Sequence, residues 1–329
     1  MTTTSPATAR FEHTRPRRPL RLGGRTSHLA RAYARQVIGG LQAVVPGLEI
    51  EYVGIVTTAD RHQGDLSELG GKGLFMKEID TALTAGRIDA AFHCMKDVPG
   101  DVPLPEGLVF AAYLERDDVR DAVVFPTGSE YSAISELPPG SRIGTSAVRR
   151  KAQLLRQRPD LDVRRFRGNV VPRLTRLDEE REMDALVLAR GGLVAVGMEH
   201  RVSQLLGMDG MCPAIGAGVV GVQCREADEG TVELLQTIDH AETRTHILAE
   251  RTMLHALQGH CNSPMAGHCH TTEDGRLSLS GMVFSQDGAT FAHAHEWDAP
   301  TRAYELGAHV AADLIRKNAR SIIAGARPD

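Results

Sequence analysis

Four arginines in the middle of the chain carry the chemistry of an anion-binding site. They are Arg149, Arg150, Arg167 and Arg173. The pattern around the first two predicts a strand that ends near Ile143 and a helix capped by Thr145 or Ser146. The free N–H groups of that first helical turn would share a space with the two guanidinium groups, which favours a ligand with several carboxylates or phosphates. A solvated basic helix face is the alternative that this stretch leaves open.

A second candidate group is the carboxylate of Asp97, which lies in the run Lys96-Asp97-Val98-Pro99 after an expected strand. Proline holds the preceding residue extended, so this run is typical of a strand end. Facing several arginines, the carboxylate would stay ionised, and it could stabilise a developing cation or move a proton. A turn aspartate paired with Lys96 is an equally simple interpretation.

The chain has five cysteines, an odd number, and no Cys-x-x-Cys pair. Free thiols in a reducing cytoplasm therefore fit better than a disulfide framework. Cys261 lies on a loop just beyond an expected helix, where an inert thiol is the simplest interpretation. The nearby His260, His268, Cys269 and His270 match no common zinc spacing, so we expect no metal.

A sequence pattern that occurs twice in the chain predicts the fold. Residues 20–38 and 142–155 each contain a strand, a glycine turn, a Thr-Ser pair and a helix, and each is followed later by a helix and a second strand, beginning at Asp89 and Asp184. Residues 219–224 are expected to return as a strand of the first half. A helix capped near Thr243, strands within 276–297 and a closing helix at 302–323 form a smaller third part.

Two similar α/β halves with mostly parallel sheets are the simplest account of this order. Ligands of such sheets bind at the C-terminal ends of the strands. Arg25, Asp97, Arg149 and Arg190 each follow an expected strand directly. We therefore expect a cleft between the halves to gather them.

The domain boundaries follow from the same pattern. Residues 1–19 are expected to be a disordered leader, 20–115 with 213–236 the first domain, 116–212 the second, and 240–329 the third. The formal net charge of −4 gives no support for nucleic-acid or membrane binding, and no apolar run is long enough to cross a bilayer. We expect a cytoplasmic monomer.

Taken together, seven segments resemble the hydroxymethylbilane synthase family, also called porphobilinogen deaminases. The resemblance runs from about residue 20 to 325 and rests on order and spacing. The segments are 70–75, 96–99, 115–121, 144–150, 167–170, 213–216 and the loop of Cys261. The resemblance implies three α/β domains, the first two like type II periplasmic binding proteins. It also implies a transferase of tetrapyrrole (porphyrin and heme) biosynthesis that releases ammonia from porphobilinogen.

In that reaction an electrophilic azafulvene is attacked by the growing oligopyrrole, and four substrates leave as linear hydroxymethylbilane. The resemblance implies a dipyrromethane cofactor joined to Cys261 by a thioether, and Asp97 as the catalytic carboxylate. The residues implied for the cofactor are Lys96, Thr145, Ser146, Arg149 and Arg150. Those implied for substrate carboxylates are Arg25, Ser27, Arg167 and Arg173, and residues 57–71 correspond to a lid. Guanidinium forks suit this task because they bind carboxylates bidentately.

The chain departs from the family pattern around the expected cleft. Ala195 stands where the family usually has a substrate-binding arginine, and we expect Arg190 to reach the same space and bind substrate. Other departures are Cys94, Ala147, Ala217 and His260. Two alternatives stay open: a divergent paralogue that joins fewer or different pyrroles, and a non-catalytic protein that binds carboxylates.

Overall fold

The computed structural model describes residues 18–61, 73, 75–259 and 263–325. These residues form two compact units. Unit 1 takes its described residues from 1–98, 102–116 and 219–244, and unit 2 takes its own from 99–101, 117–218 and 245–329. Within the described ranges, no helix combines the length and apolar character needed to span a membrane.

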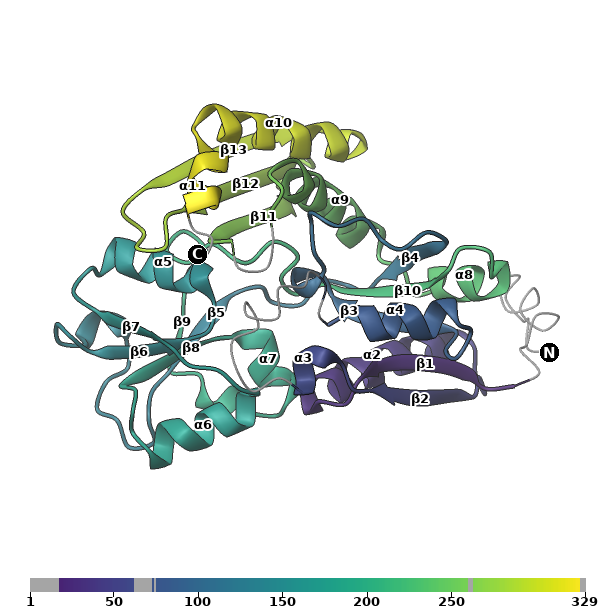
Figure 1. Cartoon of the computed structure of the whole chain (residues 1–329), viewed down its shortest axis with the longest axis horizontal. Coiled ribbons are helices and arrows are strands. Elements are labelled where there is room, and N and C mark those ends of the chain that lie inside the picture. Colours follow the sequence, from purple (N-terminus) through teal and green to yellow (C-terminus); the bar gives the residue numbers. More distant parts are fainter. Residues whose placement is uncertain (1–17, 62–72, 74, 260–262, 326–329) are drawn as a thin grey trace. The chain divides into compact units, whose positions relative to one another are not determined.

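Unit 1 is built on a five-stranded sheet of order β2-β1-β3-β10-β4 (Figure 1). The strands are β1 (Leu20–Arg25), β2 (Ile50–Ile55), β3 (Ala90–Cys94), β4 (Leu108–Tyr113) and β10 (Val220–Arg225). β1 pairs in parallel with β2 and β3, while β10 lies antiparallel between β3 and β4. Four strands thus share one direction, and β10 alone opposes them.

Helices cover both faces of this sheet because each is apolar on one side. The helices that do so are α2 (His28–Val44), α4 (Lys77–Thr84) and α8 (Glu229–Gln236), while the short helix α3 (Thr58–Arg61) follows β2. Leu41 of α2 and Leu235 of α8 share one core cluster with Leu22 of β1. Ile79 and Leu83 of α4 pack in a second cluster on the sheet. This sandwich fixes the strand ends from which the site residues project.

Unit 2 contains a second sheet with the corresponding order β7-β6-β8-β5-β9. The strands are β5 (Asp121–Val124), β6 (Arg142–Thr145), β7 (Asp162–Arg165), β8 (Ala185–Ala189) and β9 (Gln204–Leu205). Here β5 is the opposing strand, antiparallel to β8 and β9. The helices α5 (Val148–Gln157), α6 (Val170–Glu179) and α7 (Arg190–Ala195) contribute to its two core clusters.

The two sheets exchange their opposing strands along the chain. β5 follows β4 but joins the second sheet, and β10 follows β9 but joins the first. The expected return strand at 219–224 is therefore confirmed as β10. The expected α/β class with two similar halves is confirmed by this matching strand order.

The C-terminal part of unit 2 is a smaller α/β layer (Figure 1). It consists of α9 (Ala241–Ala256) from residue 245 on, β11 (Met265–Thr271), β12 (Leu277–Phe284), β13 (Phe291–Asp298), α10 (Ala303–Arg316) and α11 (Ala319–Gly325). The antiparallel sheet β11-β12-β13 buries one face against these helices. Gly281 of β12 allows close packing, because a Cβ there would lie 2.5 Å from Met253 Sδ.

Three details of this part differ from the sequence prediction. β11 was not expected as a strand. The single closing helix expected at 302–323 is two helices, because Asn318 adopts a left-handed φ of 64° between them. The helix expected to be capped near Thr243 already begins at Ala241.

Candidate active site

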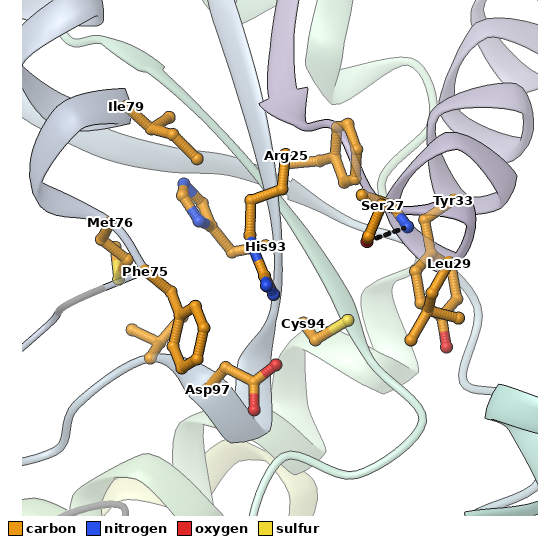
Figure 2. A pocket seen from close by; sticks show the side chains of 13 residues that line it. Arg25, Ser27, Leu29, Tyr33, Phe75, Met76, Ile79, His93, Cys94 and Asp97 are labelled. Atoms are coloured by element: carbon orange, nitrogen blue, oxygen red, sulfur yellow. Dashed lines mark hydrogen bonds between the residues drawn. The ribbon is translucent and has the colours of Figure 1, made fainter. Parts of the chain in front are cut away.

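Unit 1 carries a cavity of about 60 Å³ where β1 and β3 end (Figure 2). It is lined by Arg25, Ser27, Leu29, Ala30, Tyr33, Phe75, Met76, Ile79, Phe92, His93, Cys94, Asp97 and Val98. The walls are mostly apolar, and the polar side chains converge from the two strand ends. This is the place where sheets of this type bind ligands.

Arg25 is the last residue of β1 and reaches into this cavity (Figure 2). Its guanidinium donates to the carboxylate of Asp60, with Nε 3.1 Å from Oδ1, and lies 4.4 Å from the ring centre of Phe75. Burial would raise the pKa of Asp60, but hydrogen bonds from Arg25 and Thr57 lower it overall. Arg25 is therefore held extended by a carboxylate that stays ionised.

Ser27, two residues further on, is the N-cap of α2. Its Oγ accepts a hydrogen bond from Ala30 N at 3.2 Å, which secures the start of the helix beside the cavity. Ser27 thus has a structural role, and it also borders the pocket.

Asp97 ends the short 3-10 turn Met95–Asp97 that follows β3. The turn is fixed because Met95 N donates to Val219 O at 2.9 Å and Val98 N donates to Met95 O at 3.2 Å. Figure 2 shows the Asp97 carboxylate on the same side of the pocket as Cys94 and the Arg25 guanidinium. Lys96 belongs to the same turn, is half-buried, and does not line this cavity.

His93 is a pocket residue that sequence reasoning did not select. It is only 7% exposed, and its Nε2 lies 2.9 Å from Gln223 Oε1. Burial lowers the pKa of His93 to about 4, against a smaller opposing effect of Gln223. Burial also raises the pKa of the neighbouring Asp80 to about 6, although Gln223 lowers it. No local sequence motif indicates the group formed by His93, Gln223 and Asp80, because its members come from β3, β10 and α4.

Unit 2 brings Arg149 and Arg150 together on the carboxylate of Asp121. Arg149 Nη2 lies 2.6 Å from Oδ2, and Arg150 Nη2 lies 2.8 Å from Oδ1. The remaining Nη1 groups donate to the carbonyl oxygens of Cys212 and Val187. All three charged side chains are at least nine-tenths buried. Burial would raise the pKa of Asp121, but the two arginines hold it at about 2.

The arginines of this cluster outnumber its carboxylate. Arg173 on α6 is half-buried, and its Nε has no hydrogen-bond partner among the described residues; the same holds for Arg150 Nε. Burial and the nearby Arg150 charge lower the pKa of Arg173 to about 10. Arg149 and Arg150 share one carboxylate and Arg173 lies near Arg150, so the cluster has a positive surplus that suits an anion.

The expected helix cap at Thr145 or Ser146 is wrong. Ala147 is the N-cap of α5 and makes no side-chain cap hydrogen bond. Thr145 is buried, and its Oγ1 accepts from Ala147 N at 3.3 Å, one residue before the helix. Ser146 is exposed at the turn. The first-turn N–H groups of α5 therefore lack a side-chain cap.

The remaining predicted residues have separate surroundings. Arg167 is half-buried on the turn between β7 and α6. Arg190, the first residue of α7, donates to Glu199 and lies 3.5 Å from Asp118. Ala195 ends the same helix. Arg190 is thus held by two carboxylates of its own unit.

Some predictions fall outside the residues that the structure describes. Cys261 and His260 do so, as does most of the expected lid at 57–71, of which only 57–61 is described. Asp97 and Arg25 meet in unit 1, and Arg149, Arg150 and Arg173 meet in unit 2. The shared cleft stays a prediction. In the described part of the chain, no group of three or more His, Cys, Asp and Glu is placed to hold a metal ion.

Comparisons with solved structures give only low structural similarity. The chain aligns with the periplasmic VFT2 domain of Bordetella pertussis BvgS at TM-score 0.40 and 14% identity, covering 72% of this chain and 92% of that one. It aligns with the methionine-binding protein MetQ at TM-score 0.41 and 14% identity, covering 67% and 89%. The fold assignment therefore rests on the strand order itself.

Sequence comparisons are much closer. The model of the porphobilinogen deaminase dipyrromethane cofactor-binding domain matches residues 20–233, and that of the porphobilinogen deaminase C-terminal domain matches 244–316. Porphobilinogen deaminase 2 of Streptomyces coelicolor is 47% identical over 93% of this chain and 96% of its own length. Porphobilinogen deaminase of Syntrophotalea carbinolica is 42% identical over 93% and 95%. The chain therefore belongs to the porphobilinogen deaminase family.

Proposed function

We propose that this protein is a hydroxymethylbilane synthase, a transferase that converts porphobilinogen into linear hydroxymethylbilane on a dipyrromethane primer. The observation that carries this proposal is the Asp97 carboxylate, which shares an apolar-walled cavity with the Arg25 guanidinium. The family match over both domains supports it. We also propose that the protein acts as a cytoplasmic monomer, which light scattering during size exclusion would test.

The unit 2 arginine cluster fits the primer. A dipyrromethane built from porphobilinogen carries acetate and propionate side chains, and the cluster offers surplus positive charge with an unpaired N–H group at Arg150 Nε. Thr145 and Ser146 at the start of α5, together with Arg149 and Lys96, are the other proposed contacts. A thioether to Cys261 would hold the primer. When bound, the primer supplies the free pyrrole α-carbon that attacks the next substrate.

The proposed substrate-binding and catalytic residues have distinct tasks. Arg25, Arg167 and Arg173 bind substrate carboxylates and orient the ring. The C–N bond of the aminomethyl group breaks and ammonia leaves, so positive charge develops on the pyrrole. The Asp97 carboxylate stabilises that charge. A C–C bond then forms at the methylene carbon, and the attacking α-carbon loses a proton, which Asp97 is placed to accept.

A second candidate has one observation in its favour. Ala195 stands where the family usually has arginine, and Arg190 is already bound to Glu199 and close to Asp118. Arg190 is therefore poorly placed to replace the missing side chain. A divergent paralogue that joins fewer or different pyrroles would tolerate this loss, whereas a full hydroxymethylbilane synthase must compensate for it elsewhere.

Intact-mass spectrometry with and without porphobilinogen tests the proposal. We expect a covalent increment of two pyrrole units on the purified protein and a ladder of single-pyrrole additions after substrate is supplied. Cys261→Ser should remove the increment and the activity. A ladder that stops early, with a shorter product, would favour the paralogue. A protein that stays unmodified in both conditions would refute deaminase chemistry and favour carboxylate binding alone.

A further inference from the structure

We propose that His93 is a substrate-binding residue, whose Nδ1 accepts a hydrogen bond from an N–H group of porphobilinogen. The inference rests on the proposed function and assigns a contact on the wall of the cavity in unit 1. The two N–H sources that the substrate offers are the pyrrole nitrogen and the aminomethyl ammonium.

The partner of His93 fixes its tautomer. Gln223 presents its carbonyl oxygen Oε1, which can only accept, 2.9 Å from His93 Nε2. The proton of a neutral imidazole must therefore sit on Nε2, and Nδ1 keeps its lone pair. Both side chains are held in place, since His93 is 7% exposed and Gln223 is fully buried.

Asp80 of α4 lies near the Gln223 amide. Its carboxyl interacts with Gln223, which lowers its pKa, while burial raises that pKa to about 6. Gln223 Nε2 is buried and has no hydrogen-bond partner among the described residues, so the pairing with His93 rests on Oε1. The other charged or titratable groups that line the cavity are Arg25 from β1, Tyr33 from α2, and Cys94 and Asp97 from the end of β3.

A ligand in the cavity could donate a hydrogen bond to Nδ1 of His93. His93 lines it, and within the described residues the hydrogen bond of its ring is the one between Nε2 and Gln223. In Figure 2 the ring lies near Ile79, and its aromatic neighbour is Phe110, with which it forms an edge-to-face pair. An acceptor set in an apolar wall loses free energy unless a ligand supplies a donor. A pyrrole bearing an amine is such a ligand.

The test compares His93→Phe with His93→Asn in the primed enzyme. Asparagine places a carbonyl oxygen about where Nδ1 stands, whereas phenylalanine fills the space without an acceptor. We expect His93→Phe to raise KM for porphobilinogen roughly tenfold with little change in kcat, and His93→Asn to raise it less than about threefold. His246 is a matched control: it is also 7% exposed but is bonded to Thr271 in unit 2, so His246→Phe should leave KM unchanged.

Substrate analogues identify the donor. If the pyrrole nitrogen is the donor, an N-methylpyrrole analogue should bind the parent and His93→Phe equally well. If the ammonium is the donor, an analogue with methyl in place of aminomethyl should bind the parent and His93→Phe equally well. The proposal would be overturned if His93→Phe bound both analogues more weakly than the parent does. Equal KM values for His93→Phe and His93→Asn would also overturn it.

Gln223→Glu gives a second test if His93→Phe does not fold. A carboxylate partner raises the pKa of His93, because it favours the imidazolium, so Nδ1 would become protonated as the pH falls. KM should then rise toward low pH in this variant but not in the parent; matching profiles would refute the role of Nδ1. Failure of the parent to form the pyrrole ladder would instead refute the proposed function.

Discussion

Asp121→Asn is the substitution whose effect the structure defines best. Asp121 opens β5 and accepts from Arg149 and Arg150 at 2.6 and 2.8 Å, and its side chain is 2% exposed. Asparagine has the same shape but removes the charge and turns one oxygen into an N–H₂ donor. That donor would face a guanidinium donor, and two buried arginines would lose their counter-charge.

The magnitude follows from the carboxyl pKa. It is about 2 in the folded protein, against an ordinary 3.8, which corresponds to about 2–3 kcal/mol at neutral pH. Removing one member of a buried ion pair commonly costs about 3–5 kcal/mol, because it also strands the partner charge. Since the folded pKa is depressed, this stability is present above pH 3.8 and is lost as pH falls toward 2. The difference between variant and parent should therefore shrink in acid.

Urea unfolding and thermal melts at about pH 7 and pH 3.5 would measure this effect. We expect Asp121→Asn to lower Tm by at least about 5 °C at neutral pH. Asp184→Asn is the control, because Asp184 pairs with Arg142 at 3.0 Å but both side chains are more than a third exposed. Its loss should cost at most about 1 kcal/mol. Equal stability losses in the two variants would refute the argument from burial.

Three further predictions test other parts of the structure. Asp80 has a folded pKa of about 6, above its ordinary 3.8, so the parent loses stability as pH rises from about 4 through 6. Because Asp80 is partly exposed, Asp80→Asn should stabilise by about 1–2 kcal/mol near pH 8 and by nothing near pH 4, as melts at the two pH values would show. Gly218→Ala should destabilise by about 2 kcal/mol or more, since φ is +72° and the new Cβ would lie 2.4 Å from Asp117 O. Gly230→Ala, in α8 with open space around it, should be neutral or stabilising. Urea unfolding would contradict both predictions if Gly230→Ala proved less stable than Gly218→Ala. Asp97→Asn should keep its Tm yet release ammonia at least about a hundredfold more slowly in a single-turnover assay, and an unchanged rate would remove Asp97 from the chemistry.

The sequence predicted the parts of the fold that local patterns encode. The repeated strand, glycine turn and helix identified both halves, because side-chain periodicity depends on near neighbours. The break at Asn318 was missed, since the apolar pattern continues across it and only the left-handed backbone ends α10. β11 was missed because Gly267 and His268 interrupt the usual strand composition.

The site was predicted less completely, for a related reason. Arg149 and Arg150 were identified as a basic pair, but their shared partner Asp121 lies 28 and 29 residues away on another element. An aspartate that begins the apolar run of β5 was the available signal. Gln223 lies 130 residues from His93, so no spacing rule links the two. Such pairs are created by the strand exchange between the sheets.

The arginines differ in how easily they can exchange one carboxylate partner for another. Arg25 and Asp60 are 28% and 17% exposed, so water can solvate the Asp60 carboxylate when a substrate carboxylate takes its place on Arg25. Arg149 and Asp121 are 7% and 2% exposed, and separating them would strand buried charge. In the proposed function, Arg25 is therefore the arginine suited to bind and release carboxylates at every turnover. The Asp121 cluster is suited to a permanently held anion, as a covalently attached primer requires.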